Sequence, residues 1–223
     1  SFPTRRSSDL LPKAPYRYQE MLGVIWRENP SCYLQEGEQA VLLAALMETD
    51  NAGRPLIDAW ISRSGLSADA WLEKLFESSV IPFYHLLCRY GVALIAHGQN
   101  VTLVMKDSIP QRILLKDFQG DMRLVDEDFP QARSLPEQVK AVTARLSADY
   151  IIHDLQTGNF VTVLRFISRL TLQSGVSETR FYQILAGVLH RYMAAHPELA
   201  ERFATFDLFK PQIIRVILNP VKL

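Results

Sequence analysis

Cysteine is scarce in this sequence, with Cys32 and Cys88 the only two among 223 residues. Zinc sites and iron–sulfur clusters need closely spaced sets of cysteine or histidine ligands, which two distant cysteines do not supply. Small secreted domains that depend on disulfides are much richer in cysteine. We therefore interpret both side chains as reduced thiols and expect a cytoplasmic protein.

The sequence also lacks an excess of charge of one sign and a long apolar run. Its 24 basic and 24 acidic residues give a formal net charge of zero, so no basic surface predicts binding to nucleic acid or to an anionic membrane. A membrane-spanning helix needs about 18–20 consecutive apolar residues. The most apolar stretch, residues 80–96, is interrupted by Pro82, His85, Arg89 and Gly91. We expect neither nucleic acid nor a membrane as a partner.

Residues 1–10 read SFPTRRSSDL, which is the translation of a common sequencing-library adapter. We interpret them as an assembly artefact and exclude them from the fold prediction, as is done for a fusion scar. Residues 11–223 are then one native domain. We expect this domain to be truncated at both ends, because the adapter marks a cut and the strand-like stretch 214–223 stops without a polar tail.

Two polar clusters stand out in the middle of the chain, HGQN at 97–100 and KDFQGD at 116–121. The apolar runs 101–106 and 112–115 between them predict an antiparallel hairpin with a turn at 107–110. Asn100 then falls roughly opposite Asp117, so the clusters meet at one end of the hairpin. An imidazole, carboxamides, a lysine and carboxylates gathered there suit a phosphate and its metal, or they form a solvated hairpin end.

The remaining pattern predicts an α+β fold with antiparallel strands early and late, a hairpin, and a large helical block between them. We expect strands over 21–26, 92–95, 122–125 and 212–221, whereas the apolar run 38–47 suits a strand or a helix. Ser67 is a suitable N-cap for a helix over 68–78. Helical structure continues to 89, and Gly91 ends it.

Apolar residues at three- and four-residue spacings predict the other helices, over 55–63, 137–146, 148–155, 159–173, 178–195 and 197–206. A proline-bearing loop is expected over 126–135. In the helix over 159–173, the expected buried stripe consists of Val161, Leu164, Ile167, Leu170 and Leu172. The histidines within helical patterns are expected to be packing or surface residues: His85, His153, His190 and His196.

The motif AHGQN, followed by a hairpin and then KDFQGD, resembles the signature of the IucA/IucC family of NRPS-independent siderophore synthetases. The resemblance covers about residues 16–223 and corresponds to the palm region of that family, which is also called FhuF-like. It implies an ATP-dependent acid–amine ligase. Such an enzyme adenylates a carboxylate of citrate or of a citryl intermediate and releases pyrophosphate. An amine such as N6-acetyl-N6-hydroxylysine then displaces AMP to form an amide.

The resemblance implies ATP and Mg²⁺ as cofactors, and a homodimer as the full-length assembly. Catalytic roles at the phosphate fall on His97 and Asn100, and the magnesium ligand is Asp117. Phosphate attacked by an anion needs cations and hydrogen-bond donors around it, and the further candidates for the nucleotide are Arg27, Gln99 and Lys116. The acidic substrate is expected to contact His97 and Lys222. The fingers region that grips ATP is expected upstream, so the chain alone is expected to be inactive.

Two other classes of function remain open from the sequence. The helical stretch 136–206 alone suits a non-catalytic interaction module, which leaves the polar hairpin end without a purpose. The FhuF-like label suggests a ferric-siderophore reductase, but such a protein uses about four thiolates to hold its iron–sulfur cluster. Cys32 and Cys88 do not provide that set.

Overall fold

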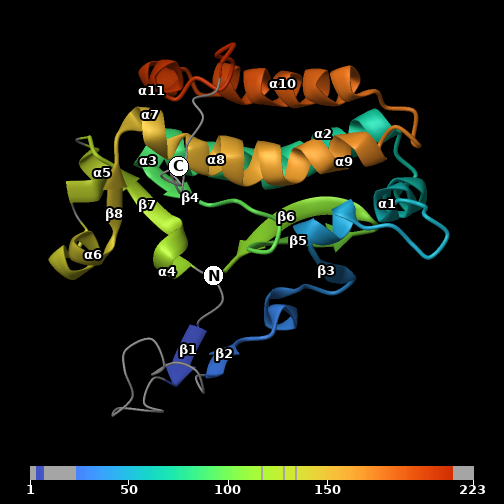
Figure 1. Cartoon of the computed structure of the whole chain (residues 1–223), viewed down its shortest axis with the longest axis horizontal. Helices are drawn as coiled ribbons and strands as arrows, with labels where there is room; N and C mark the ends of the chain where they lie inside the picture. Colours follow the sequence, from blue (N-terminus) through green and yellow to red (C-terminus); the bar gives the residue numbers. More distant parts are fainter. Residues whose placement is uncertain (1–3, 8–23, 117, 128, 134, 213–223) are drawn as a thin grey trace, which may run out of the picture.

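The computed structural model describes residues 4–7, 24–116, 118–127, 129–133 and 135–212. Its mixed architecture of helices and small sheets confirms the predicted α+β class. Helices α10 (Glu178–Ala195) and α11 (Ala200–Thr205) form an outer layer (Figure 1). They cover a second layer of helices, and the sheets lie beneath it; this second layer contains α2 (Ala68–Ser79), α3 (Ile81–Tyr90), α8 (His153–Leu155) and α9 (Arg165–Leu170). No helix among the described residues is long and apolar enough to cross a bilayer.

Three small sheets are present in the described part of the chain. One pairs β1 (Thr4–Ser7) with β2 (Val24–Arg27), so residues that we excluded from the prediction form a strand. The second has the order β3-β5-β6, with strands Glu38–Leu42, Val101–Lys106 and Ile109–Leu115. The third has the order β4-β7-β8, with strands Val92–Leu94, Met122–Val125 and Ala144–Leu146.

The predicted hairpin is confirmed, but its turn is shorter than expected. Asp107 and Ser108 alone form the turn, with φ angles of 50° and 63°, as in the type I′ turns that match the twist of two paired strands. Ile109 and Pro110 already belong to β6. Asn100 therefore lies opposite Lys116, whose backbone N–H donates to the Asn100 carbonyl at 3.3 Å.

The helices before the hairpin begin and end where their caps predict. Helix α1 spans Leu56–Ser64. The Ser67 hydroxyl accepts from the Ala70 N–H at 3.2 Å and begins α2 (Ala68–Ser79). Helix α3 (Ile81–Tyr90) ends at Gly91, whose φ is 65°. A Cβ at that glycine would meet Val125 at 2.6 Å, so both backbone conformation and space require glycine there.

Two predicted segments combine different elements. The apolar run 38–47 becomes strand β3 followed by a 3-10 helix, η3 (Leu43–Met47). The single helix predicted over 137–146 is wrong, because it divides into α6 (Glu137–Val142) and β8, which pairs parallel with β7. Pairing with the open edge of β7 outweighs local helical spacing there. The expected loop 126–135 contains a short helix, α5 (Pro130–Arg133).

The predicted helices over 148–155 and 159–173 form a nearly continuous helical segment. It contains α7 (Ala148–Ile151), α8 (His153–Leu155), a π-helix η4 (Gln156–Leu164) and α9 (Arg165–Leu170). The predicted buried stripe is only partly right. Leu164 and Ile167 are fully buried, whereas Val161 and Leu172 are exposed. The wider turns of the π-helix rotate the side chains and bury Val163 instead.

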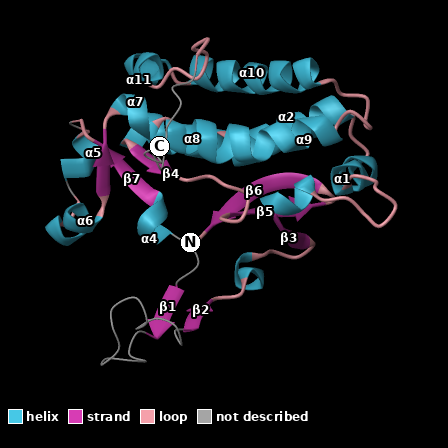
Figure 2. Ribbon diagram, viewed as in Figure 1, coloured by secondary structure: helices cyan, strands magenta, loops and turns pink. Residues whose placement is uncertain are grey.

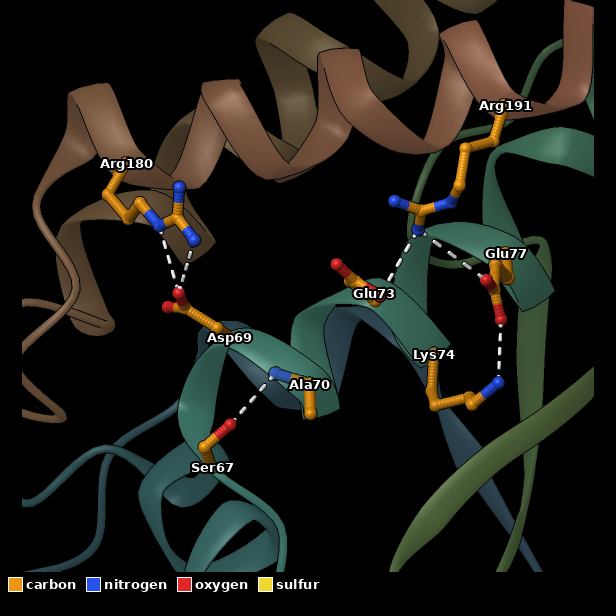
Figure 3. A network of polar contacts seen from close by, with 8 residues as sticks. All are labelled: Ser67, Asp69, Ala70, Glu73, Lys74, Glu77, Arg180 and Arg191. Carbon is orange, nitrogen blue, oxygen red and sulfur yellow. Dashed lines mark hydrogen bonds and ion pairs between the residues drawn. The ribbon is translucent and has the colours of Figure 1, made fainter. Parts of the chain in front are cut away.

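The core lies between the helical layers and beneath α2. Phe76 of α2 meets Phe181 of α10 edge to face with ring centroids 5.0 Å apart, and both are fully buried. Figure 3 shows the ion pairs along this contact, where Arg180 reaches Asp69 at 2.7 Å and Arg191 lies 3.1 Å from a Glu73 oxygen. Exposed pairs of this kind contribute less than about 1 kcal/mol each, so apolar burial holds α10 in place.

The four histidines of the helical segments occupy packing or surface positions. His85 Nδ1 lies 2.7 Å from the Tyr192 hydroxyl, and His153 is buried. His190 stacks on Phe209 with ring centroids 4.4 Å apart, and His196 lies 3.1 Å from a Glu198 oxygen. The predicted strand over 212–221 falls, apart from its first residue, outside the described residues.

Replacing Phe181 by alanine tests the contact between α2 and α10. A cavity of this kind in a core lowers the free energy of unfolding by about 3–5 kcal/mol. Phe166 on α9 is 45% exposed, and its replacement by alanine should cost less than about 1 kcal/mol. Urea unfolding of both variants measures the difference. Equal losses in the two variants would contradict this account of the core.

Candidate functional site

Two of the chain's crossings between the two three-stranded sheets carry the polar motifs. Residues 95–100 lead from β4 in one sheet to β5 in the other. Residues 116–121 lead back from β6 to β7 and include the short helix α4 (Phe118–Asp121). Figure 2 shows these two sheets beneath the helical layer. The sheet topology therefore brings the two motifs together.

The first crossing is held in a tight turn against η3. The Asn100 N–H donates to the His97 carbonyl at 3.0 Å, and the Ala44 N–H donates to the Gly98 carbonyl at 3.1 Å. A Cβ added to Gly98 would lie 3.1 Å from Ala44 backbone atoms. Glycine at position 98 thus permits the close approach that fixes the turn.

The second crossing ends at Asp121, beside the start of the first. The Ile95 N–H donates to the Asp121 carbonyl at 3.0 Å, which extends the pairing of β4 with β7 by one residue. This backbone contact places the Asp121 side chain next to the HGQN turn.

The side chains of His97, Asn100 and Asp121 meet there, and we call them the His97–Asn100–Asp121 cluster. The Asn100 amide nitrogen donates to Asp121 Oδ2 and lies 3.1 Å from His97 Nε2. His97 Nε2 is 3.9 Å from Asp121 Oδ2. An amide nitrogen carries two hydrogens, so Asn100 serves both neighbours. A neutral His97 then accepts at Nε2 and carries its proton on Nδ1.

The cluster has a buried base and a more open rim. Asn100 is 8% exposed, whereas the His97 and Asp121 side chains are 34% and 28% exposed. Asp121 Oδ1 makes no hydrogen bond to another described residue. The imidazole Nδ1–H and this carboxylate oxygen therefore remain for a ligand, while the carboxamide holds both groups in place.

The structure describes the side chains of some predicted site residues but not of others. His97 and Asn100 are brought together as predicted, and Gln99 is exposed on the same turn. Lys116 is half-buried beside Asn100. Arg27 ends β2 in a separate sheet, and its side chain is outside the described residues, as are Asp117 and Lys222. The roles of these last three remain predictions.

Asp121 is the functional candidate that the predicted site omitted. The hairpin pairing pointed to Asp117 as the acid that meets Asn100, but Asp121 makes the contact among the described residues. Asp121 is the last residue of α4, whereas Asp117 is outside the described residues. Both acids belong to the motif KDFQGD, which was the available signal for Asp121.

A second carboxylate lies near the cluster. Asp154 of α8 pairs with Arg123 of β7 at 3.4 Å, and its side chain is 13% exposed. Burial raises the pKa of Asp154 to about 6; the charge of Asp121 acts in the same direction, and Arg123 opposes both. Asp121 and Asp154 therefore lie close enough for their charges to interact, and Arg123 of β7 pairs with Asp154 of α8.

These groups fit a magnesium-bound phosphate. Magnesium takes oxygen ligands, keeps several waters, and is commonly held by one or two carboxylates together with substrate phosphates. Asp121 can supply such a carboxylate, and the Gln99 amide and His97 Nδ1–H can donate to phosphate oxygens. Among the described residues no group of three or more His, Cys, Asp or Glu side chains could hold a metal ion. A metal shared with a phosphate ligand suits this arrangement better than one held by protein alone.

Comparison with known proteins places the chain in a family. The model described as "Ferric iron reductase FhuF-like transporter" matches residues 69–223. The chain belongs to this FhuF-like family. It is 67% identical over 213 residues to aerobactin synthase of Escherichia coli, which covers 96% of the chain and 37% of that protein. The aerobactin synthase of Vibrio mimicus is 59% identical, over 100% of the chain and 38% of that protein.

A solved structure of an aerobactin synthetase also resembles this chain. Aerobactin synthetase IucC from a hypervirulent pathotype of Klebsiella pneumoniae superposes with a TM-score of 0.88 at 67% identity, over 93% of the chain and 38% of that protein. The resemblance to siderophore synthetases that HGQN and KDFQGD indicated is confirmed. The chain spans well under half the length of these relatives.

Removing the Asp121 carboxylate should destabilise the protein through Asn100. The buried amide of Asn100 would lose one of its two acceptors, and leaving that N–H unpaired costs about 1–3 kcal/mol. Asp126 is exposed, so Asp126→Ala should change the free energy of unfolding by less than about 0.5 kcal/mol. Urea unfolding compares Asp121→Ala with this control. Equal stability of the two variants would show that the contact with Asn100 is not formed.

Asp154 should make stability depend on pH. Its pKa is raised from 3.8 to about 6 in the folded protein, so the folded state binds this proton more tightly than the unfolded state. The resulting stabilisation is full below about pH 4 and is lost as the pH rises to about 6. Asp154→Asn should remove this decline, and Asp149→Asn, at an exposed position, should retain it. The test measures the free energy of unfolding of the unsubstituted chain and both variants from pH 4 to 7. Parallel curves for all three would contradict the raised pKa of Asp154.

Proposed function

We propose that this chain is the palm portion of an ATP-dependent siderophore synthetase of the aerobactin type. The observation that carries the proposal is the His97–Asn100–Asp121 cluster, built from the two motifs of a chain 67% identical to aerobactin synthase. The reaction adenylates a carboxylate of citrate or of a citryl intermediate and releases pyrophosphate. A hydroxamate-bearing amine such as N6-acetyl-N6-hydroxylysine then displaces AMP and forms the amide.

The geometry of the cluster suits the first of these steps. A carboxylate that attacks the α-phosphorus of ATP brings two anions together, so the site must supply hydrogen-bond donors and cations where charge develops. His97 Nδ1–H is one such donor, and Gln99 is another. Asn100 holds the imidazole from behind. Magnesium, when bound, neutralises phosphate charge, and Asp121 and Asp117 are the carboxylates that would hold it.

The remaining contributions are carried over from the sequence. Arg27 would bind nucleotide phosphate as a bidentate cation, Lys116 would contact phosphate, and Lys222 would meet the acidic substrate. The full-length enzyme would be a cytoplasmic homodimer. The ATP-gripping fingers are proposed to lie upstream, so the chain by itself should release no pyrophosphate.

The description of the family model favours a second candidate, a ferric iron reductase. An iron–sulfur cluster commonly needs four thiolates, and the sequence has two cysteines. Cys88 is buried in α3, where burial raises its pKa to about 12, and Cys32 is exposed on η2 (Pro30–Tyr33). A non-catalytic interaction module would leave the buried carboxamide of Asn100 and its two partners without a purpose. The synthetase accounts for more of the structure than either alternative.

A chimera tests the proposal. The matching segment of Escherichia coli aerobactin synthase is replaced by residues 11–223 of this chain, and pyrophosphate release is measured with ATP, Mg²⁺ and the acidic substrate. His97→Ala should lower the rate about 100-fold or more, because it removes a donor at the reacting phosphate. The control is His190→Ala, since this imidazole stacks on Phe209 away from both motifs. An active chimera whose His97→Ala variant keeps full turnover would refute the site assignment.

A further inference from the structure

The π-helix η4 lies directly behind the HGQN turn. Asn159 of η4 is fully buried, and its amide nitrogen donates to the carbonyl of Ala96 at 3.0 Å. Ala96 immediately precedes His97. A Cβ at the neighbouring Gly158 would lie 3.3 Å from the Ala96 nitrogen and from Ile95 Cγ2. Backbone and side chain of η4 therefore press against the peptide that carries the imidazole.

The side-chain amide of Asn159 lowers the stability of the folded protein. Its Oδ1 is buried and has no hydrogen-bond partner among the described residues. An unsatisfied buried polar group destabilises a folded protein, and an apolar residue of similar size avoids that cost. Stability alone thus does not account for asparagine at this position.

The π-helix is a second unusual feature at the same place. Turns of this kind are rare and occur often at functional sites. The buried residues of η4 include Gln156, Gly158 and Asn159 beside Val163 and Leu164, so polar and apolar residues share its buried side. Two uncommon features, an unsatisfied carboxamide and a π-helix, thus coincide behind His97.

We propose that Asn159 is a positioning residue, which fixes the peptide of residues 96–97 and so sets the imidazole of His97 against Asn100 and Asp121. Backbone groups hold the rest of the turn, through Ile95 to Asp121, Ala44 to Gly98 and Asn100 to His97. The Ala96 carbonyl is instead held by a side chain. Substitution of Asn159 therefore removes this one hydrogen bond, and the backbone hydrogen bonds of the turn still form but open more often. The catalytic meaning of this role rests on the proposed function.

Hydrogen exchange tests the positioning without ATP or turnover. In Asn159→Leu, the amides of Ala44, Ile95 and Asn100 should exchange about tenfold faster, since one hydrogen bond that holds the turn is lost. Amides of the β5–β6 ladder should keep their rates. The control is Ser168→Ala, because Ser168 is also fully buried on the adjoining helix but bonds the Arg165 carbonyl and Tyr182 of α10, not the HGQN turn.

A second measurement follows the imidazole itself. The nitrogen chemical shifts of His97 should show Nε2 as the acceptor in the unsubstituted chain and a mixture of tautomers in Asn159→Leu. Unchanged turn amides and an unchanged imidazole in folded Asn159→Leu would overturn the proposal, as would equal acceleration of all amides. If Asn159→Leu does not fold, the same two readouts on Asn159→Ala decide.

The functional arm uses the active chimera described above. Asn159→Leu should lower kcat for pyrophosphate release about tenfold with little change in KM for ATP, because only the imidazole is displaced while the other proposed phosphate contacts remain. An unchanged kcat would overturn the positioning role. Failure of the proposed function is a distinct result, since it appears as full turnover in His97→Ala and leaves the exchange and imidazole measurements unaffected.

Discussion

The site depends on the buried carboxamide of Asn100, which joins two crossings of the chain between separate sheets. One crossing carries His97 and the other carries Asp121, and the Asn100 amide nitrogen contacts both. Each sheet has only three strands, and sheets of this size gain stability mainly by packing against helices. Helices α2 and α3 pack on the strands, and η4 packs on residues 95 and 96. The helical block thus positions a polar turn that the sheets could not hold alone.

The molecule has its main apolar contacts between helices and its candidate functional groups at the ends of strands. Burial of aromatic side chains holds α10 on α2, where Phe76 and Phe181 meet. The polar groups with chemical use lie instead where β4, β5, β6 and β7 begin or end, because strand ends free backbone and side chains for a ligand. The family description, taken alone, suggests an iron reductase. The groups at the strand ends are suited to phosphate.

Local signals in the sequence predicted those parts of the fold that local physics determines. Ser67 and Gly91 mark helix ends through side-chain capping and a positive φ, and both predictions are confirmed. Strand β8 was missed because its stability comes from pairing with β7, which no local pattern reports. The π-helix was missed because its wider turn changes which residues are buried, as Val163 shows.

The candidate site was predictable in part for the same reason. The motifs HGQN and KDFQGD identified His97 and Asn100, and the hairpin predicted that the motifs meet. The choice between Asp117 and Asp121 depended on a single turn of α4 and on the register of β4 with β7. Register is set by tertiary pairing, so the sequence alone did not distinguish the two acids.

The shared amide nitrogen of Asn100 has one more consequence. Its two hydrogens point to His97 and to Asp121, which leaves neither hydrogen for a ligand. The carboxamide therefore fixes the spacing between an imidazole and a carboxylate while adding no charge of its own.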